Sequence, residues 1–246
     1  MNLSTNTVLI TGGGSGIGLA LATRFHRAGS TVAICGRRED KLREARERLP
    51  GLLTHVCDLS RPEDRRGLAA WVVSEVPSVN VLVNNAGVQH VLRIEEGEGD
   101  WGATQEEIAI NLEAPVHLAT LLAPHLRQQQ HSAIINVTSG LAFTPLARVP
   151  VYSATKAALH SFTLSLRHQL AGTPIAVIEI APPAVDTDLG GPGLHTFGVN
   201  VDEFADAIMP RLAAGELEMG YGFAEQARRA SRHDLDTVFQ QMNQQR

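Results

Sequence analysis

Lysine and tyrosine are scarce in this chain of 246 residues. It contains two tyrosines, and only two of its 21 basic residues are lysines, so arginine supplies nearly all of the positive charge. The formal net charge is -5, and the arginines are dispersed along the sequence. Proteins that bind nucleic acid concentrate positive charge to neutralise phosphates. This composition therefore argues against a nucleic-acid partner.

Long apolar runs and metal-binding patterns are also missing. The opening MNLSTNTVLITGGG has no basic segment, and no later stretch reaches the length needed to span a bilayer. We therefore expect a cytoplasmic protein without a membrane partner. Cys35 and Cys57 lack CxxC or histidine spacing, which indicates reduced, buried thiols. The ten histidines show no ligand spacing either, so we predict no metal site.

Short apolar segments alternate along the chain with longer helical patterns. The segments are apolar throughout, which is typical of strands in a parallel sheet that helices cover on both faces. We therefore predict an α/β fold in which residues 1–246 form a single domain around a doubly wound parallel sheet. The expected strands span residues 7–11, 31–35, 53–57, 79–83, 133–138 and 175–180.

A glycine-rich turn follows the first expected strand and precedes a helical pattern. Gly12 would allow the tight turn, and Gly16 and Gly18 would let the backbone approach the sheet closely. The start of the helix would then offer free N–H groups to a pyrophosphate. The alternative is an ordinary glycine turn, but the strand before and the helix after favour a dinucleotide site. The cofactor residues predicted in this turn are Gly12, Gly14, Ser15, Gly16, Ile17 and Gly18.

Two arginines, Arg37 and Arg38, follow the second expected strand. A fold that binds NAD usually places an acidic residue here for the ribose 2′-hydroxyl. Arginines at the start of a helix are disfavoured by the macrodipole, and a 2′-phosphate between them would explain their placement. We therefore predict NADP rather than NAD. The alternative is a solvated turn in which Glu39 and Asp40 pair with the arginines.

One of the rare tyrosines stands four residues before one of the rare lysines, as Tyr152 and Lys156. Residues four apart share a face of a helix. A phenol with a free pKa of about 10 transfers protons poorly near neutrality unless a cation stabilises its phenolate. The pair is therefore suited to proton transfer. The alternative is an amphipathic helix on which the tyrosine packs and the lysine snorkels.

These motifs together resemble the short-chain dehydrogenase/reductase superfamily, in its branch of roughly 250 residues, from about residue 5 to about residue 190. Ser139 lies thirteen residues before Tyr152, as the family pattern expects. The resemblance implies a Rossmann-type, NAD(P)-binding domain. It is carried by Thr11 to Gly18, Asp58, Asn84-Asn85-Ala86-Gly87, Asn111, Ser139, and Tyr152 with Lys156.

The resemblance also implies a catalytic tetrad of Asn111, Ser139, Tyr152 and Lys156. Tyr152 would move the proton, Lys156 would lower its pKa and hold the nicotinamide ribose, and Ser139 would bind the substrate oxygen. Asn111 would support a water relay to Lys156. Each motif has a structural alternative, such as helix capping by Asp58 or a plain turn at Asn84. The further cofactor residues implied are Asp58, at the adenine, and Leu59, Asn85, Ala86 and Gly87.

After the sixth expected strand the chain reads APPAVDTD from Ala181 to Asp188. Pro183 stands where the superfamily more often has glycine. The resemblance implies that Pro182, Val185 and Thr187 still contact the cofactor. The double proline, together with GLAF and INLEAP, is similar to a subgroup of uncharacterised bacterial oxidoreductases, one of which is named for an association with D-alanyl lipoteichoic acid synthesis.

The expected substrate pocket is apolar, which favours a small apolar carbonyl or alcohol. The densest Gly/Pro region spans 181–198, and a short lid at about 188–200 would cover the substrate. His90 and His195 either contact a polar group of the substrate or lie in solvated loops. The walls are expected to be Leu141, Phe143, Leu146, Val149, Pro183 and Leu189 to Phe197.

The C-terminal region departs from the family pattern. The glycine-rich ending common in this branch is absent, and a helical tail is expected over 224–242. Loss of the last strand would favour a homodimer, formed through helices at 111–127 and 152–170, with a tetramer as the alternative.

Three functions are compatible with these motifs. The favoured one is an oxidoreductase that transfers a hydride between NADP(H) and a carbonyl or secondary alcohol, with Tyr152 as general acid/base. A non-catalytic NADP-binding sensor would be expected to lose Tyr152 or Lys156, which are both present. An epimerase or dehydratase would be expected to show TGxxGxxG and a longer substrate domain.

Overall fold

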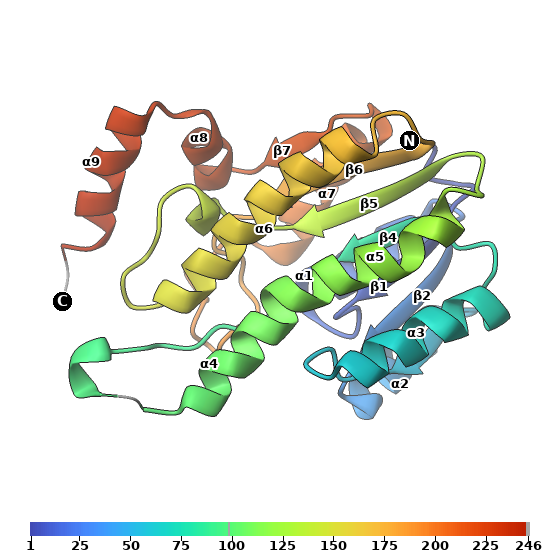
Figure 1. Cartoon of the computed structure of the whole chain (residues 1–246), viewed down its shortest axis with the longest axis horizontal. Coiled ribbons are helices and arrows are strands. Elements are labelled where there is room, and N and C mark those ends of the chain that lie inside the picture. The colour runs from blue at the N-terminus through green and yellow to red at the C-terminus, as the bar shows by residue number, and fades with distance from the viewer. Residues whose placement is uncertain (98, 245–246) are drawn as a thin grey trace.

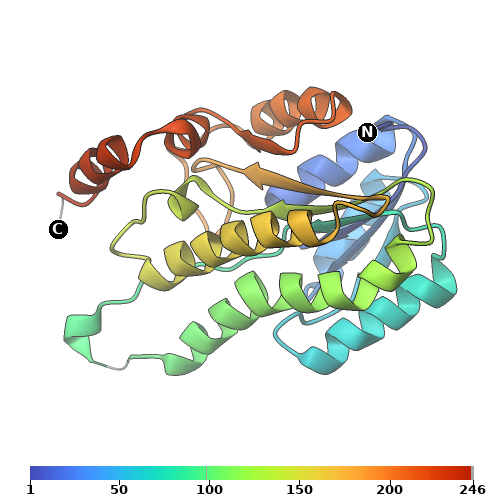
Figure 2. The same cartoon turned by 45° about the horizontal axis from the view of Figure 1, so that its top comes forward.

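The computed structural model describes residues 1–97 and 99–244. Its centre is a parallel sheet with the strand order β3-β2-β1-β4-β5-β6-β7. Helices cover both faces of this sheet (Figures 1 and 2), so the predicted doubly wound α/β fold is confirmed. The strands are β1 Thr7–Thr11, β2 Thr31–Gly36, β3 Leu53–Val56, β4 Val81–Asn84, β5 Ser132–Val137, β6 Ile175–Ala181 and β7 Glu218–Gly220.

Side chains alternate between two apolar layers, one on each face of the sheet. In β1, Val8 and Ile10 pack with α1, α2 and α7, whereas Leu9 packs with α3, α5 and α6 on the other face. The helices are α1 Gly16–Arg27, α2 Glu39–Arg48, α3 Pro62–Glu75, α4 Trp101–Ile108, α5 Ala114–Leu126, α6 Pro150–Gln169, α7 Val201–Ala213, α8 Phe223–Arg229 and α9 Arg232–Met242.

Strand β1 lies between β2 and β4, and the chain crosses from one side of β1 to the other after β3. The loops leaving β1 and β4 therefore diverge at the carboxyl edge of the sheet. In open α/β sheets this reversal creates the crevice in which ligands bind.

The expected strands differ from the observed ones mainly at their ends. The expected start of the fourth strand at residue 79 was wrong by two residues. The backbone N–H of Val79 donates to the carbonyl of Val76, so residue 79 belongs to the turn after α3. The next residue, Asn80, connects to β1 because its backbone N–H donates to the carbonyl of Thr7.

The expectation that the last strand is lost was wrong. Residues Glu218–Gly220 form β7, which pairs in parallel with β6. Only three residues take part, too few to show a strand pattern in the sequence. The expected tail helix is also interrupted, because Ser231 caps α9 with Asp234 after α8 has ended. The missing strand therefore no longer supports a homodimer, and the homodimer stays a prediction.

Two smaller expectations concern cysteines and hydropathy. Cys35 and Cys57 are buried free thiols, as the sequence analysis predicted. Across residues 1–97 and 99–244, no helix has both the length and the apolar character of a bilayer span. Over the same residues, no group of three His, Cys, Asp or Glu side chains is arranged to hold a metal ion.

Candidate active site

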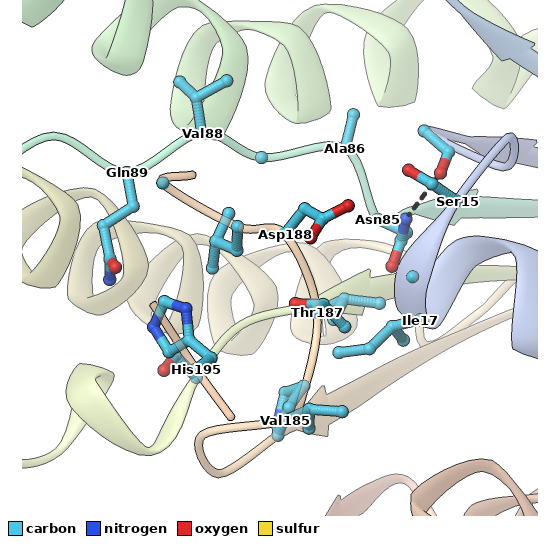
Figure 3. Close-up of a pocket in the computed structure, with 18 of the residues that line it drawn as sticks. Ser15, Ile17, Asn85, Ala86, Val88, Gln89, Val185, Thr187, Asp188 and His195 are labelled. Atoms are coloured by element: carbon cyan, nitrogen blue, oxygen red, sulfur yellow. Dashed lines mark hydrogen bonds between the residues drawn. The ribbon is translucent and has the colours of Figure 1, made fainter. Parts of the chain in front are cut away.

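A cavity of about 1150 Å³ opens at the carboxyl edge of the sheet, beside the loops that leave β1 and β4. Residues from both ends of the chain line it, and Figure 3 shows part of this lining. Of the predicted cofactor residues, all except Gly18 and Asp58 line the cavity. Of the predicted tetrad, Ser139, Tyr152 and Lys156 line it, whereas Asn111 is fully buried beside it.

The turn after β1 has a backbone that only glycine adopts easily. Gly12 and Gly16 have φ angles of +64° and +53°, in the left-handed region. A Cβ on Gly18 would lie 2.3 Å from the carbonyl oxygen of Gly12. A Cβ on Gly13 would lie 2.4 Å from Cγ2 of Ile34. Gly13 was not among the predicted residues, although the run of three glycines was a signal for it.

We expect Gly18→Ala to destabilise the protein, because the added methyl group would collide with the Gly12 backbone and with Nδ2 of Asn85. The expected loss is about 1–3 kcal/mol of unfolding free energy. Gly67→Ala is the matched control, since a Cβ there meets nothing within 4 Å and alanine favours the helix. Urea denaturation of both variants measures the difference, and equal stability would contradict the close packing at Gly18.

The first turn of α1 lines the cavity through Gly16 and Ile17. The N-cap residue Ser15 does not cap this helix with its side chain. Its hydroxyl instead accepts a hydrogen bond of 2.8 Å from Nη2 of Arg38. The start of α1 therefore presents backbone N–H groups to the cavity, which is a favourable site for an anion.

Arg37 and Arg38 both line one corner of the cavity. Arg37 forms an ion pair with Glu106 of α4, and Arg38 donates to Ser15. The alternative in which Glu39 and Asp40 pair with these arginines is therefore wrong. Those two carboxylates lie in the first turn of α2, where they complement the helix dipole.

Asp58 itself does not line the cavity, but its neighbour Leu59 does. Leu59 lines the cavity, whereas Oδ1 of Asp58 accepts hydrogen bonds from the backbone N–H and the hydroxyl of Ser60, at 3.0 Å and 2.8 Å. Asp58 therefore stabilises the turn before α3. This role is similar to the helix capping that was the structural alternative for Asp58.

The NNAG turn after β4 is fixed to the glycine-rich turn by hydrogen bonds. Nδ2 of Asn85 donates to the carbonyl oxygen of Thr11 at 2.9 Å. The Thr11 hydroxyl accepts from the backbone N–H groups of Asn85 and Ala86, each at 3.0 Å. Asn84 donates to Asn136 of β5 at 2.9 Å. These bonds hold the ends of β1, β4 and β5 together beneath the cavity.

Tyr152 and Lys156 lie on one face of α6, as their spacing predicts, and both side chains are buried. Nζ of Lys156 lies 5.6 Å from the centre of the Tyr152 ring and donates to the carbonyl oxygen of Val137 at 2.9 Å. Ser139 follows β5, and its Oγ accepts from the backbone N–H of Leu141 at 3.1 Å.

Asn111 lies in a π-helical turn, Ala109–Glu113, which joins α4 to α5. Its Oδ1 accepts from the backbone N–H of Val88 at 2.9 Å, and its Nδ2 donates to the carbonyl of Val88 at 2.8 Å and to the hydroxyl of Thr155 at 3.3 Å. Its amide therefore anchors the loop after β4 to α6.

Burial shifts the pKa values of the central pair in opposite directions. It raises the pKa of Tyr152 to about 12, against a hydrogen bond from Ser139 that lowers it. It lowers the pKa of Lys156 to about 8, against the charge of Glu107, which raises it. In the protein without cofactor the pKa of Tyr152 is therefore raised overall, because desolvation of the phenolate dominates, and the lowering by Lys156 stays a prediction.

The substrate end of the cavity differs in part from the expected walls. Phe143 and Val149 do not line it, since Phe143 packs edge-on against His160 and Val149 is buried ahead of α6. Phe223 of α8 and Met242 of α9 line it instead. Sequence reasoning missed both, because a tail roughly ninety residues from Tyr152 carries no signal of where it folds back. The expected walls that do line the cavity are Leu141, Leu146, Pro183, Leu189, Gly190, His195 and Phe197.

The end of α9 is attached to the loop before α6. Oδ1 of Asn243 accepts from the backbone N–H of Ala147 at 2.6 Å, and its Nδ2 donates to the carbonyl of Pro145 at 3.1 Å. These two bonds place Met242 at the cavity wall.

His90 and His195 both lie in loops and line the cavity, so contact with a polar group of the substrate stays a prediction for them. Within residues 1–97 and 99–244, Nε2 of His90 and Nδ1 of His195 are buried without a hydrogen-bond partner. Figure 3 places His195 beside Gln89, at the end of the pocket away from Ser15 and Asn85.

The segment expected to form the lid is an irregular loop that is closed at its base. Its ends are joined by hydrogen bonds from the Asp186 N–H to the Val199 carbonyl and from the Val199 N–H to the Ala184 carbonyl, at 2.8 Å and 2.9 Å. A Cβ on Gly198 would lie 2.7 Å from the carbonyl carbon of Val185, so only glycine fits there.

Comparisons with known proteins identify the family of this site. Residues 6–194 match the model of the short chain dehydrogenase family, and the chain belongs to that family. It is 47% identical to the uncharacterized oxidoreductase DltE of Bacillus subtilis over 250 residues, which cover 100% of this chain and 99% of the relative. The chain is therefore an oxidoreductase of this family that resembles the DltE subgroup.

Solved structures agree with this assignment. A short-chain dehydrogenase from Sphingobium yanoikuyae in complex with NADPH is 28% identical, with a TM-score of 0.82 over 96% of this chain and 94% of that one. The 3-ketoacyl-(acyl-carrier-protein) reductase of Brucella melitensis, complexed with NADH, is also 28% identical, with a TM-score of 0.77 over 84% and 90% of the two chains.

Proposed function

We propose that the protein transfers a hydride between NADP(H) and a carbonyl or secondary alcohol. The observation that carries this proposal is that Ser139, Tyr152 and Lys156 line the same cavity as the glycine-rich turn after β1. One cavity can therefore hold a dinucleotide and a small substrate together. The family relationship supports this reading, and the two complexes above contain NADPH and NADH.

The residues around the cavity fit a nicotinamide dinucleotide. The uncapped start of α1 suits a pyrophosphate, and the left-handed glycines leave the space that a Cβ would fill. Asn85, Ala86 and Gly87 would lie along the adenosine side, with Leu59 at the adenine. Pro182, Val185 and Thr187 would meet the nicotinamide, and Lys156 would hold its ribose. The bound cofactor would supply or accept the hydride.

The side chains of the tetrad would handle the proton and the developing charge. During carbonyl reduction Tyr152 would donate its proton to the substrate oxygen, and Ser139 would stabilise the negative charge on that oxygen. Tyr152 keeps its proton in the resting site, since its pKa is about 12. Asn111 would hold Val88 and α6 in place through its three hydrogen bonds.

The substrate we propose is a small, largely apolar carbonyl or alcohol. Leu141, Leu146 and Met242 provide apolar walls beside Ser139. The loop at 188–200 would serve as a lid over the substrate, and its exposed Phe197 suits such a movable cover.

A preference for NADP over NAD follows from the corner that Arg37 and Arg38 line. We expect Arg38→Ser to raise the KM for NADPH about 10-fold to 100-fold and to leave the KM for NADH nearly unchanged, because one charge-assisted contact to the 2′-phosphate is lost. The matched control is Arg43→Ser, an arginine of α2 outside the cavity lining. Steady-state kinetics with each cofactor measures the ratio.

Two outcomes would change the proposal. A wild-type preference for NADH would remove the assignment of Arg37 and Arg38 to a 2′-phosphate. Fluorescence titration that shows NADPH binding, together with no NADPH oxidation across a panel of ketones and aldehydes, would favour the sensor.

A further inference from the structure

Glu107 is a buried carboxylate beside the proposed catalytic pair. It lies near the end of α4, four residues before Asn111, and is 1% exposed. In the part of the chain that the structure describes, its one hydrogen bond is a long one of 3.3 Å, donated by the backbone N–H of His90 to Oε1. A buried carboxylate with so little compensation is costly, which is typical of functional sites.

The charge of Glu107 acts on both members of the pair. It raises the pKa of Lys156, and it raises the pKa of Tyr152. Lys156 in turn lowers the pKa of Glu107, although burial outweighs this effect and raises it to about 7. The pKa values of Glu107 and Lys156, about 7 and about 8, are close enough for a proton to pass between the two groups at little cost.

Glu107 also lines a second cavity, of about 400 Å³, between α4 and residues 90–97 and 99–100. His90 lines both cavities, so the two cavities lie next to each other, with His90 between them. Among the residues that the structure describes, the other charged groups lining the second cavity are Arg93, Glu96 and Asp100, and Arg93 is paired with Glu96 at 3.0 Å. Glu107 therefore lies close enough to Lys156 for their charges to interact, and it also lines the second cavity.

Asn111 is poorly placed to relay protons with its side chain. Both hydrogens of its amide are donated to Val88 and Thr155, and its oxygen accepts from Val88. The carboxyl of Glu107, by contrast, can take up and release a proton.

We propose that Glu107 relays protons between the second cavity and Lys156 during each catalytic cycle. The inference rests on the proposed hydride-transfer function. In carbonyl reduction, Lys156 returns a proton toward the Tyr152 phenolate, across an intervening hydroxyl group or water. The neutral Lys156 amine takes up the proton of the Glu107 carboxylic acid through an intervening water, and water in the second cavity reprotonates the Glu107 carboxylate. The steps reverse when an alcohol is oxidised.

The test separates the first turnover from later ones. Because Tyr152 starts protonated, Glu107→Gln is expected to keep the first hydride transfer at the wild-type rate in rapid mixing with NADPH and a carbonyl substrate. Its steady-state kcat is expected to fall about 10-fold to 100-fold. Wild-type kcat for reduction is expected to fall as the pH rises through about 7, where the acid form of Glu107 is lost, and Glu107→Gln should lack this limb.

Rescue of the rate by small weak acids distinguishes a proton relay from a structural role. If Glu107 were only structural, added acids would not restore kcat. The second cavity is large enough to admit acetate or imidazole, and these buffers are expected to restore the steady-state kcat of Glu107→Gln in proportion to their concentration. Glu107→Asp, which keeps a carboxylic acid, is expected to retain most of the steady-state kcat. It replaces Glu107→Gln as the test variant if Glu107→Gln does not fold. Glu96→Gln makes the same chemical change at an exposed position of the same cavity and should leave both phases unchanged.

A measurement without cofactor completes the design. Difference infrared spectroscopy of the cofactor-free protein should show a protonated-carboxyl band that disappears as the pH rises through about 7 and is missing from Glu107→Gln. A wild-type protein that binds NADPH but never turns over would overturn the proposed function and the relay with it. Normal wild-type turnover with equal first and later turnovers in Glu107→Gln would overturn the relay alone.

Discussion

A Tyr152→Phe variant is expected to bind NADPH as tightly as the wild-type protein and to lose about 10³-fold in kcat for carbonyl reduction. The ring stays in place, because burial on α6 positions it and phenylalanine keeps the same shape. Only the hydroxyl group that donates the proton is removed. Fluorescence titration measures binding, and loss of the absorbance of the reduced nicotinamide measures turnover.

The chain supplies its own control for this substitution. Its only other tyrosine, Tyr221, hydrogen-bonds to Glu203 and does not line the cavity. Tyr221→Phe is expected to keep full turnover. Full turnover in Tyr152→Phe would rule out the assigned proton donor, and a loss in both variants would point to a shared effect on folding.

Lys156→Met is expected to lose about 10³-fold in kcat/KM, with part of the loss in weaker NADPH binding, since the ammonium group would hold the ribose and pass protons to Tyr152. The substitution should also change how stability depends on pH. The pKa of Lys156 falls from 10.5 to about 8 on folding, because the charge is buried.

The direction of the pH effect follows from proton binding. Between pH 8 and 10.5 the unfolded chain holds a proton on this lysine that the folded protein has released, so wild-type stability rises with pH in that window. Below pH 8 the folded protein bears the full cost of the buried charge. Lys156→Met lacks that cost, and its stability relative to wild type should decrease by about 2 kcal/mol between pH 7 and about pH 9.5.

Urea denaturation at several pH values measures this difference. The other lysine, Lys41, is partly exposed and paired with Glu44, so Lys41→Met should follow the wild-type pH dependence of stability. Parallel curves for wild type and Lys156→Met would contradict the shifted pKa of Lys156.

The sequence predicted those features whose causes are local. Apolar runs placed six strands, and the spacing of Tyr152 and Lys156 placed them on one helix face. The strand β7 was missed because three residues are held mainly by pairing with β6. Glu107 was missed because it follows Gln105 and Glu106, where a polar helix face is the natural interpretation. Its surroundings include the backbone of His90, a residue distant in sequence, and sequence spacing does not reveal this contact.

Because Asn243 attaches the end of α9 to the loop before α6, the cavity is lined by parts of the chain that are far apart in sequence. The turn around Gly12 and the face of α6 hold the parts that the proposed hydride chemistry requires, whereas Met242, which also lines the cavity, belongs to the last turn of α9. Substitutions that accumulate in this tail can reshape the entrance for a substrate without disturbing the glycine turn. Substrate selectivity can therefore be changed in the tail while the residues proposed for hydride transfer are preserved.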